Sequence, residues 1–165
     1  MEESWAGDSF GRWVRCGRRR TRCARRFFSA LGVAIVGARV LDLYAGTGSL
    51  GLESASRGAA SVVWVESNPR AAAQLQKAVQ ELCPKAGRVV KSDATAFLGR
   101  IGISTAFDIV FADPPYAKGL QEKTLPLLMA GSIVAPSGLV VFEMGVEEVP
   151  FESPGWSPDM GSDVR

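Results

Sequence analysis

The sequence predicts an α/β fold whose mostly parallel, twisted sheet is covered by helices on both faces. From Arg39 onward, short runs rich in Val, Leu and Phe alternate with helical patterns, which is typical of consecutive βαβ units. The chain has 165 residues, 47% of them hydrophobic, and is therefore about the size of one domain with one buried core.

The predicted elements follow one another in regular order. Apolar runs typical of buried strands cover residues 40–44, 61–66, 88–91, 107–112 and 139–143. Helical patterns cover residues 48–57, 71–82, 93–98 and 120–130. Asn68 can cap the second helix, and Pro69 suits the first helical turn because an N–H has no partner there. Trp64 is expected to lie in the core, and no regular element is predicted after Gly145.

The composition excludes several kinds of chemistry. The chain has no histidine, so no imidazole can act as general base or metal ligand. Its three cysteines, Cys16, Cys23 and Cys83, form no C-x-x-C pair, so we expect neither a zinc site nor a disulfide framework, and no bound metal. The chain begins without the order of a secretory signal, and prolines and glycines interrupt its longest uncharged run. We therefore expect a cytoplasmic protein with no membrane partner.

Charge is distributed unevenly along the chain. Residues 1–40 carry nine arginines against three acidic residues, a balance of +6, which leaves −4 for residues 41–165 of the net +2. Guanidinium groups pair with phosphates, and nearby aromatic rings can stack on bases. We expect a basic arm over residues 1–26, a globular domain over 27–150 and an irregular tail over 151–165. The arginines expected to bind RNA are Arg18, Arg19, Arg20, Arg22, Arg25 and Arg26. The alternative is a solvated end without a partner.

A glycine-rich loop between the first strand and the first helix predicts a ligand site. The stretch from Asp42 to Gly51, D-L-Y-A-G-T-G-S-L-G, contains G-x-G-x-x-G. Glu66 lies 20 residues after Gly46, at the end of the second strand, where a carboxylate can hold ribose hydroxyls. A dinucleotide would fit this pattern too, but its pyrophosphate would be repelled by Asp42, whereas an ammonium group would be attracted. We therefore predict S-adenosylmethionine, which carries an ammonium, a sulfonium and an adenosine.

The backbone of this loop and one further carboxylate complete the predicted donor site. Ala45, Gly46 and Gly48 let the backbone approach the ligand closely, ahead of the donors at a helix N-terminus. Asp93 follows the third strand, on the same edge of the sheet, and could accept from the adenine amine. An N-cap for the next helix explains Asp93 equally well.

A second motif, Asp113-Pro114-Pro115-Tyr116, follows the fourth strand directly. The exocyclic amine of a base is a poor nucleophile because its lone pair is delocalised into the ring. Asp113 and the Pro114 carbonyl can accept hydrogen bonds from such an amine, and Tyr116 offers a flat face for stacking. The motif therefore predicts a site that positions an amine for in-line methyl transfer. A proline turn without function is the alternative.

Three segments together resemble the RsmD family of 16S rRNA guanine-N2 methyltransferases. They are V-L-D-L-Y-A-G-T-G-S-L-G-L-E-S-A-S-R-G-A at 40–59, V-E at 65–66 and F-D-I-V-F-A-D-P-P-Y at 107–116. The resemblance implies a Rossmann-like class I methyltransferase fold, S-adenosylmethionine as donor and S-adenosylhomocysteine as product. It also implies a guanine of 16S rRNA as acceptor, within the small ribosomal subunit or its assembly intermediate. By resemblance, Asp42, Gly46 and Gly48 hold the methionine end of the donor, Glu66 holds its ribose, and Asp113, Pro114 and Tyr116 hold the guanine.

The chain also departs from the family pattern. Residues 19–28 lack the proline of the family's R-P-T segment, and residues 149–165 are rich in proline where the family has a β-hairpin. An incomplete strand pair at the C-terminal edge is therefore expected. The chain is also expected to be a monomer. Two alternative functions stay open: an amino methyltransferase for another substrate, such as adenine N6 in DNA, and a non-catalytic protein that binds S-adenosylmethionine or RNA.

Overall fold

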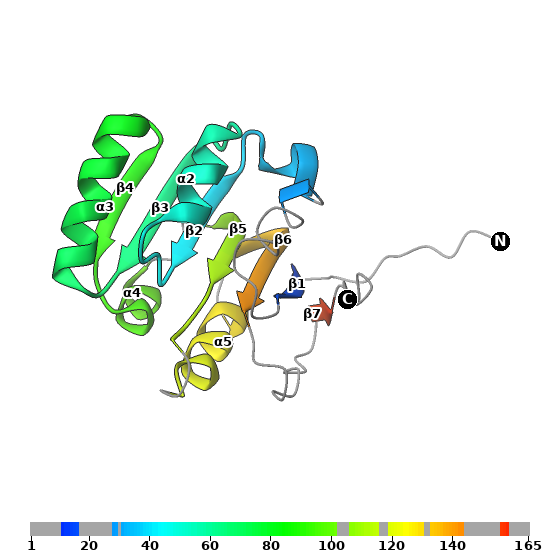
Figure 1. Ribbon diagram of the computed structural model, residues 1–165. Coiled ribbons are helices and arrows are strands. Elements are labelled where there is room, and N and C mark those ends of the chain that lie inside the picture. The colour runs from blue at the N-terminus through cyan, green and yellow to red at the C-terminus, as the bar shows by residue number, and fades with distance from the viewer. Residues whose placement is uncertain are drawn as a thin grey trace.

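A computed structural model describes residues 11–16, 28–29, 31–101, 106–115, 119–130, 133–143 and 156–158. Seven strands form one sheet in the order β4-β3-β2-β5-β6-β1-β7, and all its strand pairs are parallel (Figure 1). The strands are β1 Gly11–Cys16, β2 Arg39–Leu43, β3 Ser61–Glu66, β4 Gly87–Lys91, β5 Phe107–Ala112, β6 Val134–Glu143 and β7 Trp156–Pro158. The helices are the 3-10 turn η1 Gly32–Ile35, α2 Ser49–Ser56, α3 Pro69–Leu82, α4 Ala94–Arg100 and α5 Leu120–Ala130. The predicted α/β class and parallel sheet are confirmed.

Local signals predicted most element bounds. The strands β3 and β5 and the helix α5 have the predicted limits. Helix α3 begins at Pro69, where the side chain of Asn68 accepts hydrogen bonds from the backbone N–H groups of Arg70 and Ala71, as predicted for a cap. The strand predicted over 40–44 ends instead at Leu43, because the next residue has a positive φ.

Three strand features were not predicted. Strand β6 begins at Val134, five residues earlier than expected, and the register of its pairing with β5 shifts between Phe107 and Ile109. Strand β1 pairs with β6 on one side and with the short β7 on the other. The sequence assigned β1 to the basic arm because its arginines interrupt the apolar alternation, and assigned no element to β7. Both strands take their conformation from distant partners, which local patterns do not reveal.

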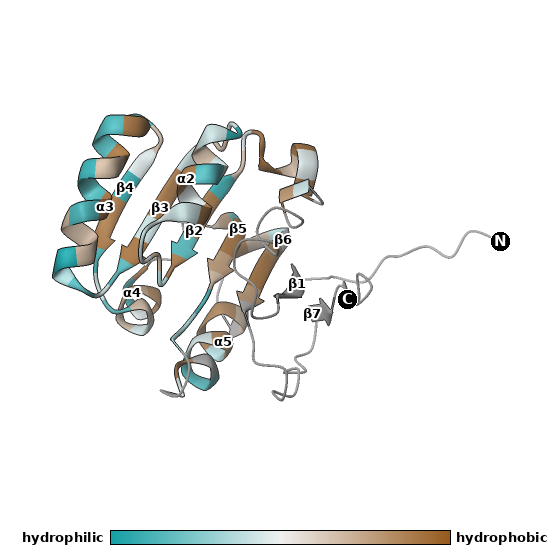
Figure 2. Cartoon of the chain, in the orientation of Figure 1, coloured by the Kyte–Doolittle hydropathy of each residue, from teal (hydrophilic) through white to brown (hydrophobic). Residues whose placement is uncertain are grey.

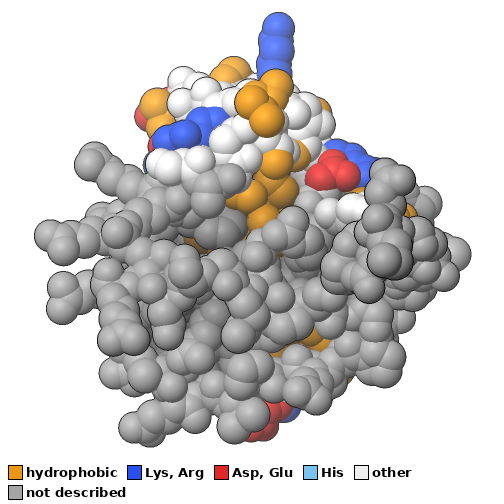
Figure 3. Space-filling view, turned by 90° about the vertical axis from the view of Figure 1, so that its right-hand side faces the viewer, with side chains coloured by type: hydrophobic (Ala, Val, Ile, Leu, Met, Phe, Trp, Pro, Cys, Tyr) orange, Lys and Arg blue, Asp and Glu red, His pale blue; other side chains and the backbone are white. Residues whose placement is uncertain are grey.

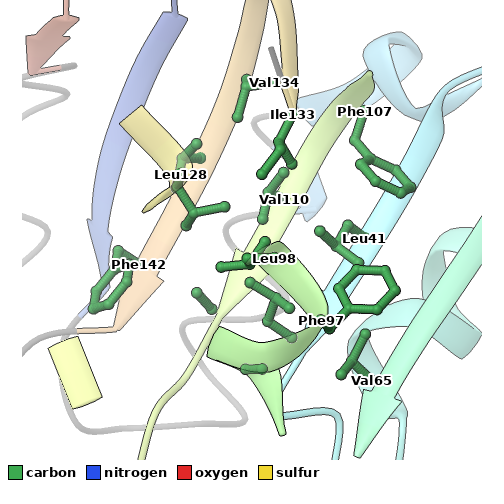
Figure 4. Packing of buried hydrophobic residues seen from close by; sticks show 14 of the residues in the cluster. Leu41, Val65, Phe97, Leu98, Phe107, Val110, Leu128, Ile133, Val134 and Phe142 are labelled. Atoms are coloured by element: carbon green, nitrogen blue, oxygen red, sulfur yellow. The ribbon is translucent and has the colours of Figure 1, made fainter. Parts of the chain in front are cut away.

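Helices cover the sheet on both faces over two apolar clusters. The cluster under α4 and α5, here the α4–α5 cluster, includes Leu41, Phe97 and Leu128 (Figure 4). The cluster under η1, α2 and α3, here the α2–α3 cluster, includes Val40 and the fully buried Trp64, so its predicted core position is confirmed. Hydropathy follows this arrangement, since β3, β5 and β6 are mainly hydrophobic whereas α3 carries many hydrophilic residues (Figure 2). Apolar burial between the layers is the main source of stability.

A polar contact joins β2 and β5 at their N-terminal ends. Both the backbone N–H and the guanidinium of Arg39 donate to the carboxylate of Asp108, with Nη2 to Oδ1 at 2.9 Å. These hydrogen bonds lower the pKa of Asp108. The contact fixes the register of the two central strands at their N-terminal ends, away from the predicted ligand site.

In the part of the chain that the structure describes, no helix is long and apolar enough to cross a bilayer. Some hydrophobic side chains reach the surface on the side shown in Figure 3. The most exposed large hydrophobic residues among those described are Val33, Leu82 and Val36. Scattered exposed residues of this kind are normal on proteins.

Strand order places a ligand crevice at the centre of the sheet. The chain runs from β2 outward to β3 and β4, then returns to the other side of β2 with β5 and β6. The connections therefore diverge between β2 and β5, at the carboxyl ends of the strands. In parallel α/β sheets this switch point is the usual place for a ligand.

Candidate functional site

A pocket of about 210 Å³ opens at the carboxyl ends of the strands, on the β4 side of the switch point. Its walls come from the ends of β2 and β3, the start of α4 and the loop after β5. The lining residues are Tyr44, Val65, Glu66, Ser67, Ser92, Ala94 and Pro115. The two predicted motifs, far apart in the sequence, therefore contribute to one cavity.

The glycine-rich loop depends on left-handed backbone conformations. Gly46 and Gly48 have φ angles of 55° and 74°, which glycine adopts at little cost. Gly48 also forms the N-cap of α2, and a Cβ there would collide with the side chain of Leu75. The N–H of Gly48 donates to the carbonyl of Ala45 at 2.7 Å. The loop is thus a closed turn that needs glycine at both predicted positions.

Asp42 lies buried beneath this loop. Its Oδ2 accepts a hydrogen bond from the backbone N–H of Gly51 at 3.0 Å, which ties the end of β2 to the first turn of α2. Burial raises the pKa of Asp42 to about 7; the Gly51 N–H lowers it, and the charges of Asp113 and Glu66 raise it. A cation beside this carboxyl would favour its ionised form. The sequence predicted the carboxylate's place but not its bond to the loop.

Glu66 joins the glycine-rich loop to the start of α3. Its Oε2 accepts from the backbone N–H of Gly46 at 2.8 Å, and its Oε1 accepts from that of Asn68 at 2.7 Å. The side chain also lines the pocket. Each carboxylate oxygen can accept two hydrogen bonds, so both retain capacity for a hydroxyl in the pocket. The placement fits the predicted ribose contact.

Asp93 forms the N-cap of α4, one of the two roles that its position predicted. Its Oδ1 accepts from the backbone N–H of Ala96 at 3.1 Å and from the hydroxyl of Thr95. The Thr95 hydroxyl is the main cause of a lowered pKa at Asp93. Its neighbours Ser92 and Ala94 line the pocket. A contact between Asp93 and an adenine amine stays a prediction.

The second motif lies across the switch point from the glycine-rich loop. Asp113 is half-buried at the end of β5, Pro114 is buried and Pro115 is exposed at the pocket. Asp113 is close enough to Asp42 for its charge to affect the latter's pKa. Three carboxylates thus gather at the ends of adjacent strands. Predicted residues outside the described part of the chain are Tyr116, Arg18, Arg19, Arg20, Arg22, Arg25 and Arg26. No group of three potential metal ligands occurs among the residues that the structure describes.

Trp64 supports the glycine-rich loop from below, a role that the sequence analysis missed. Its Nε1 donates to the carbonyl of Gly48 at 3.3 Å. A Cβ on Gly51 would collide with the same nitrogen, so only glycine leaves room for the indole. The third glycine of G-x-G-x-x-G generally allows close packing between helix and sheet. Gly51 was therefore the signal in the sequence that a large side chain of the sheet packs against the start of α2.

Comparisons with known proteins show the family to which the chain belongs. The family model described as "Conserved hypothetical protein 95" matches residues 16–161. The protein named ribosomal RNA small subunit methyltransferase D of Escherichia coli is 39% identical over 137 residues, which cover 82% of this chain and 68% of the relative. The chain belongs to the RsmD family.

Solved structures extend the likeness of this RsmD-family chain to three dimensions. A protein of Escherichia coli assigned as a methyltransferase superposes with a TM-score of 0.68 at 40% identity, over 73% of this chain and 67% of the other. A protein of Haemophilus influenzae assigned as a methylase gives a TM-score of 0.71 at 30% identity, over 83% and 78%. The predicted family and the class I methyltransferase fold are confirmed.

Proposed function

We propose that this chain transfers a methyl group from S-adenosylmethionine to the exocyclic N2 of a guanine in 16S ribosomal RNA. The observation that carries the proposal is the gathering of Asp42, Glu66 and Asp113 around the switch point of an RsmD-family fold. Asp42 and Glu66 hold the glycine-rich loop, whereas Asp113 begins the D-P-P-Y motif. The first two suit a cationic donor, and the third suits an amine acceptor.

The residues present fit this donor. The pocket at the ends of β3 and β4 offers apolar and hydroxyl-bearing walls for a nucleoside, with Glu66 at its rim for ribose hydroxyls. The buried Asp42 provides a negative charge that an ammonium group would stabilise in its ionised form. When bound, S-adenosylmethionine supplies a methyl group activated by its positively charged sulfonium. In our proposal, Ala45, Gly46 and Gly48 hold its methionine end.

The chain's part in the reaction is to bind and orient the acceptor. The Asp113 carboxylate and the Pro114 carbonyl accept hydrogen bonds from the guanine amine, which directs the nitrogen lone pair toward the donor. Burial of Pro114 and two successive prolines hold the direction of these acceptors. The amine nitrogen bonds to the methyl carbon as the bond between that carbon and the sulfonium sulfur breaks, and the nitrogen loses a proton. We assign the acceptance of this proton to the Asp113 carboxylate. We assign Tyr116 to stacking on the base.

The ribosomal RNA must also be held outside the pocket. We assign its phosphates to the arginines of residues 18–26, because guanidinium groups pair with phosphate oxygens. The acceptor is proposed to be the small ribosomal subunit or its assembly intermediate, in the cytoplasm where subunits are built. We propose that the chain acts as a monomer, with the arginines of residues 18–26 as its RNA-binding segment. Because β1 and β7 belong to the sheet, the methyltransferase domain includes them and extends beyond the predicted residues 27–150.

One experiment tests the substrate directly. The protein is incubated with labelled S-adenosylmethionine and, separately, with undermethylated small subunits, naked 16S rRNA and duplex DNA, and the digested nucleosides are identified by mass spectrometry. N2-methylguanosine from a ribosomal sample is expected, and a preference for subunits over naked RNA supports the assembled substrate. N6-methyladenine from DNA, or donor binding without transfer to any sample, contradicts the proposal.

A further inference from the structure

Tyr44 leaves the alternation of its strand through an unusual backbone conformation. Along β2, Leu41 and Leu43 belong to the α4–α5 cluster, and Val40 belongs to the α2–α3 cluster. A two-residue period would place residue 44 on the side of Val40. The φ of Tyr44 is 60°, and its side chain packs instead against the α4–α5 cluster. A bulky residue keeps such a φ only where its surroundings fix it, and this occurs most often at functional sites.

The turned side chain spans from the donor pocket to α5. Tyr44 lines the pocket, and its hydroxyl oxygen lies 2.6 Å from Oγ1 of Thr124, 80 residues later in the chain. Thr124 is fully buried in α5. Desolvation raises the pKa of Tyr44, so the phenol stays neutral and can act as donor or acceptor. The bond therefore connects a pocket wall to a helix interior.

Helix α5 is the first helix after the acceptor motif in the chain. Asp113, Pro114 and Pro115 come directly after β5, and α5 begins at Leu120. Gly119, just before the helix, has a φ of 58° and marks a sharp turn into it. Pro115 of this motif lines the same pocket as Tyr44, so the phenol that is bonded to α5 and the acceptor motif form walls of one cavity.

From these contacts we propose that Tyr44 is a positioning residue that couples the donor pocket to the acceptor motif. Its ring senses occupation of the pocket, and its hydroxyl holds α5, and thereby the loop after β5, in the geometry for transfer. This inference rests on the proposed function, because it assigns the pocket to the donor and the loop to the acceptor. It predicts that donor binding rigidifies α5 through a single hydroxyl–hydroxyl contact.

Kinetics with two single variants, their double variant and a control variant test the coupling. Tyr44→Phe and Thr124→Val each remove one hydroxyl and keep most of the side-chain volume. At saturating donor, kcat on the ribosomal substrate is expected to fall about tenfold in each, with no further fall in the double variant because both remove the same contact. The KM for the donor should stay within about twofold of wild type, because the pocket walls remain. Ser54→Ala, which deletes a buried hydroxyl bonded to the Leu50 carbonyl in α2, is the control and should keep its kcat.

Hydrogen exchange gives a readout that does not require turnover. S-adenosylhomocysteine is expected to slow amide exchange in α5 of the wild type and to slow it less in Tyr44→Phe, at equal ligand affinity. Equal slowing in both proteins, or no response of α5 in the wild type, overturns the coupling. A wild type that makes no N2-methylguanosine but shows Tyr44-dependent protection contradicts the proposed function alone. An active wild type whose variants keep full kcat contradicts the coupling alone.

Discussion

Replacing the buried Asp42 by asparagine should stabilise the ligand-free protein at alkaline pH. The fold raises the pKa of this carboxyl from 3.8 to about 7, mainly by burial, so the folded state binds its proton more tightly than the unfolded state does. Its contribution to stability is therefore present in acid and is lost as pH rises toward 7. One pKa unit corresponds to about 1.4 kcal/mol. Relative to strongly acidic solution, the raised pKa of Asp42 therefore lowers the stability of the fold by about 2 kcal/mol at pH 5, where only the unfolded state ionises, and by about 4 kcal/mol at pH 8.

An asparagine at this position would keep an oxygen acceptor for the Gly51 N–H but would not ionise. Its buried NH₂ group carries a cost of about 1–3 kcal/mol if unpaired, but that cost does not change with pH. The free energy of unfolding of Asp42→Asn, relative to that of wild type, should therefore rise by about 2–3 kcal/mol from pH 5 to pH 8. Urea unfolding at each pH, with equal denaturant slopes, measures this difference. A difference that stays constant across the range would mean that Asp42 titrates as an ordinary exposed carboxyl.

The same substitution should weaken donor binding. S-adenosylhomocysteine carries the ammonium group of the donor, so wild type should bind it about tenfold more tightly at pH 8 than at pH 6, as the ionised fraction of Asp42 rises from about one tenth to about nine tenths. Calorimetry on Asp42→Asn should find weaker binding with little dependence on pH. Equal affinities of wild type and Asp42→Asn for S-adenosylhomocysteine at pH 8 would show that Asp42 does not contact the ammonium group. Stability and ligand affinity thus oppose each other at this residue.

Further variants separate the parts of the site. Glu66→Gln should weaken S-adenosylhomocysteine binding about tenfold. The reason is that the amide NH₂ of glutamine would face the backbone N–H of either Gly46 or Asn68, where the carboxylate accepts a hydrogen bond. A wild-type affinity in calorimetry would count against the ribose assignment. Asp113→Ala should leave that affinity within about twofold but slow single-turnover methyl transfer at least about 100-fold, and undiminished transfer would exclude Asp113 from the mechanism. Gly87→Ala should destabilise the fold by about 3 kcal/mol without changing the site, because its Cβ would collide with the backbone oxygen of Val62; an unchanged thermal midpoint would contradict this.

Local sequence patterns predicted the central part of the fold well. The β3 and β5 runs are buried and rich in β-branched or aromatic residues, and Asn68-Pro69 specifies a helix start through hydrogen bonds within three residues. These signals need no knowledge of the rest of the chain. The edge strands β1 and β7 lack them, since their conformation depends on pairing with residues far away in sequence.

The candidate site was predicted in its charges but not in its contacts. Glycine spacing placed Asp42 and Glu66 at the ends of neighbouring strands, as the structure shows. The bonds of these carboxylates to backbone N–H groups of the loop depend on the three-dimensional turn, so no spacing rule gives them. The sequence pattern predicts Tyr44 as a strand residue. That prediction is wrong because Tyr44 has a left-handed φ, which bulky side chains rarely adopt and which no local pattern indicates. Its bond to Thr124 joins residues 80 positions apart.

The position of β1 in the sheet affects how the chain folds during synthesis. Its residue Arg12 is in register with Leu139, and its other edge pairs with β7 near residue 156, so β1 has no partner until β6 has been synthesised. The strands from β2 to β5 can pair earlier. Contacts so distant in sequence close slowly, because a long loop must be ordered before they form. A nascent chain ending before β6 would leave the edge of β5 unpaired, and an unpaired strand edge can pair with a second chain.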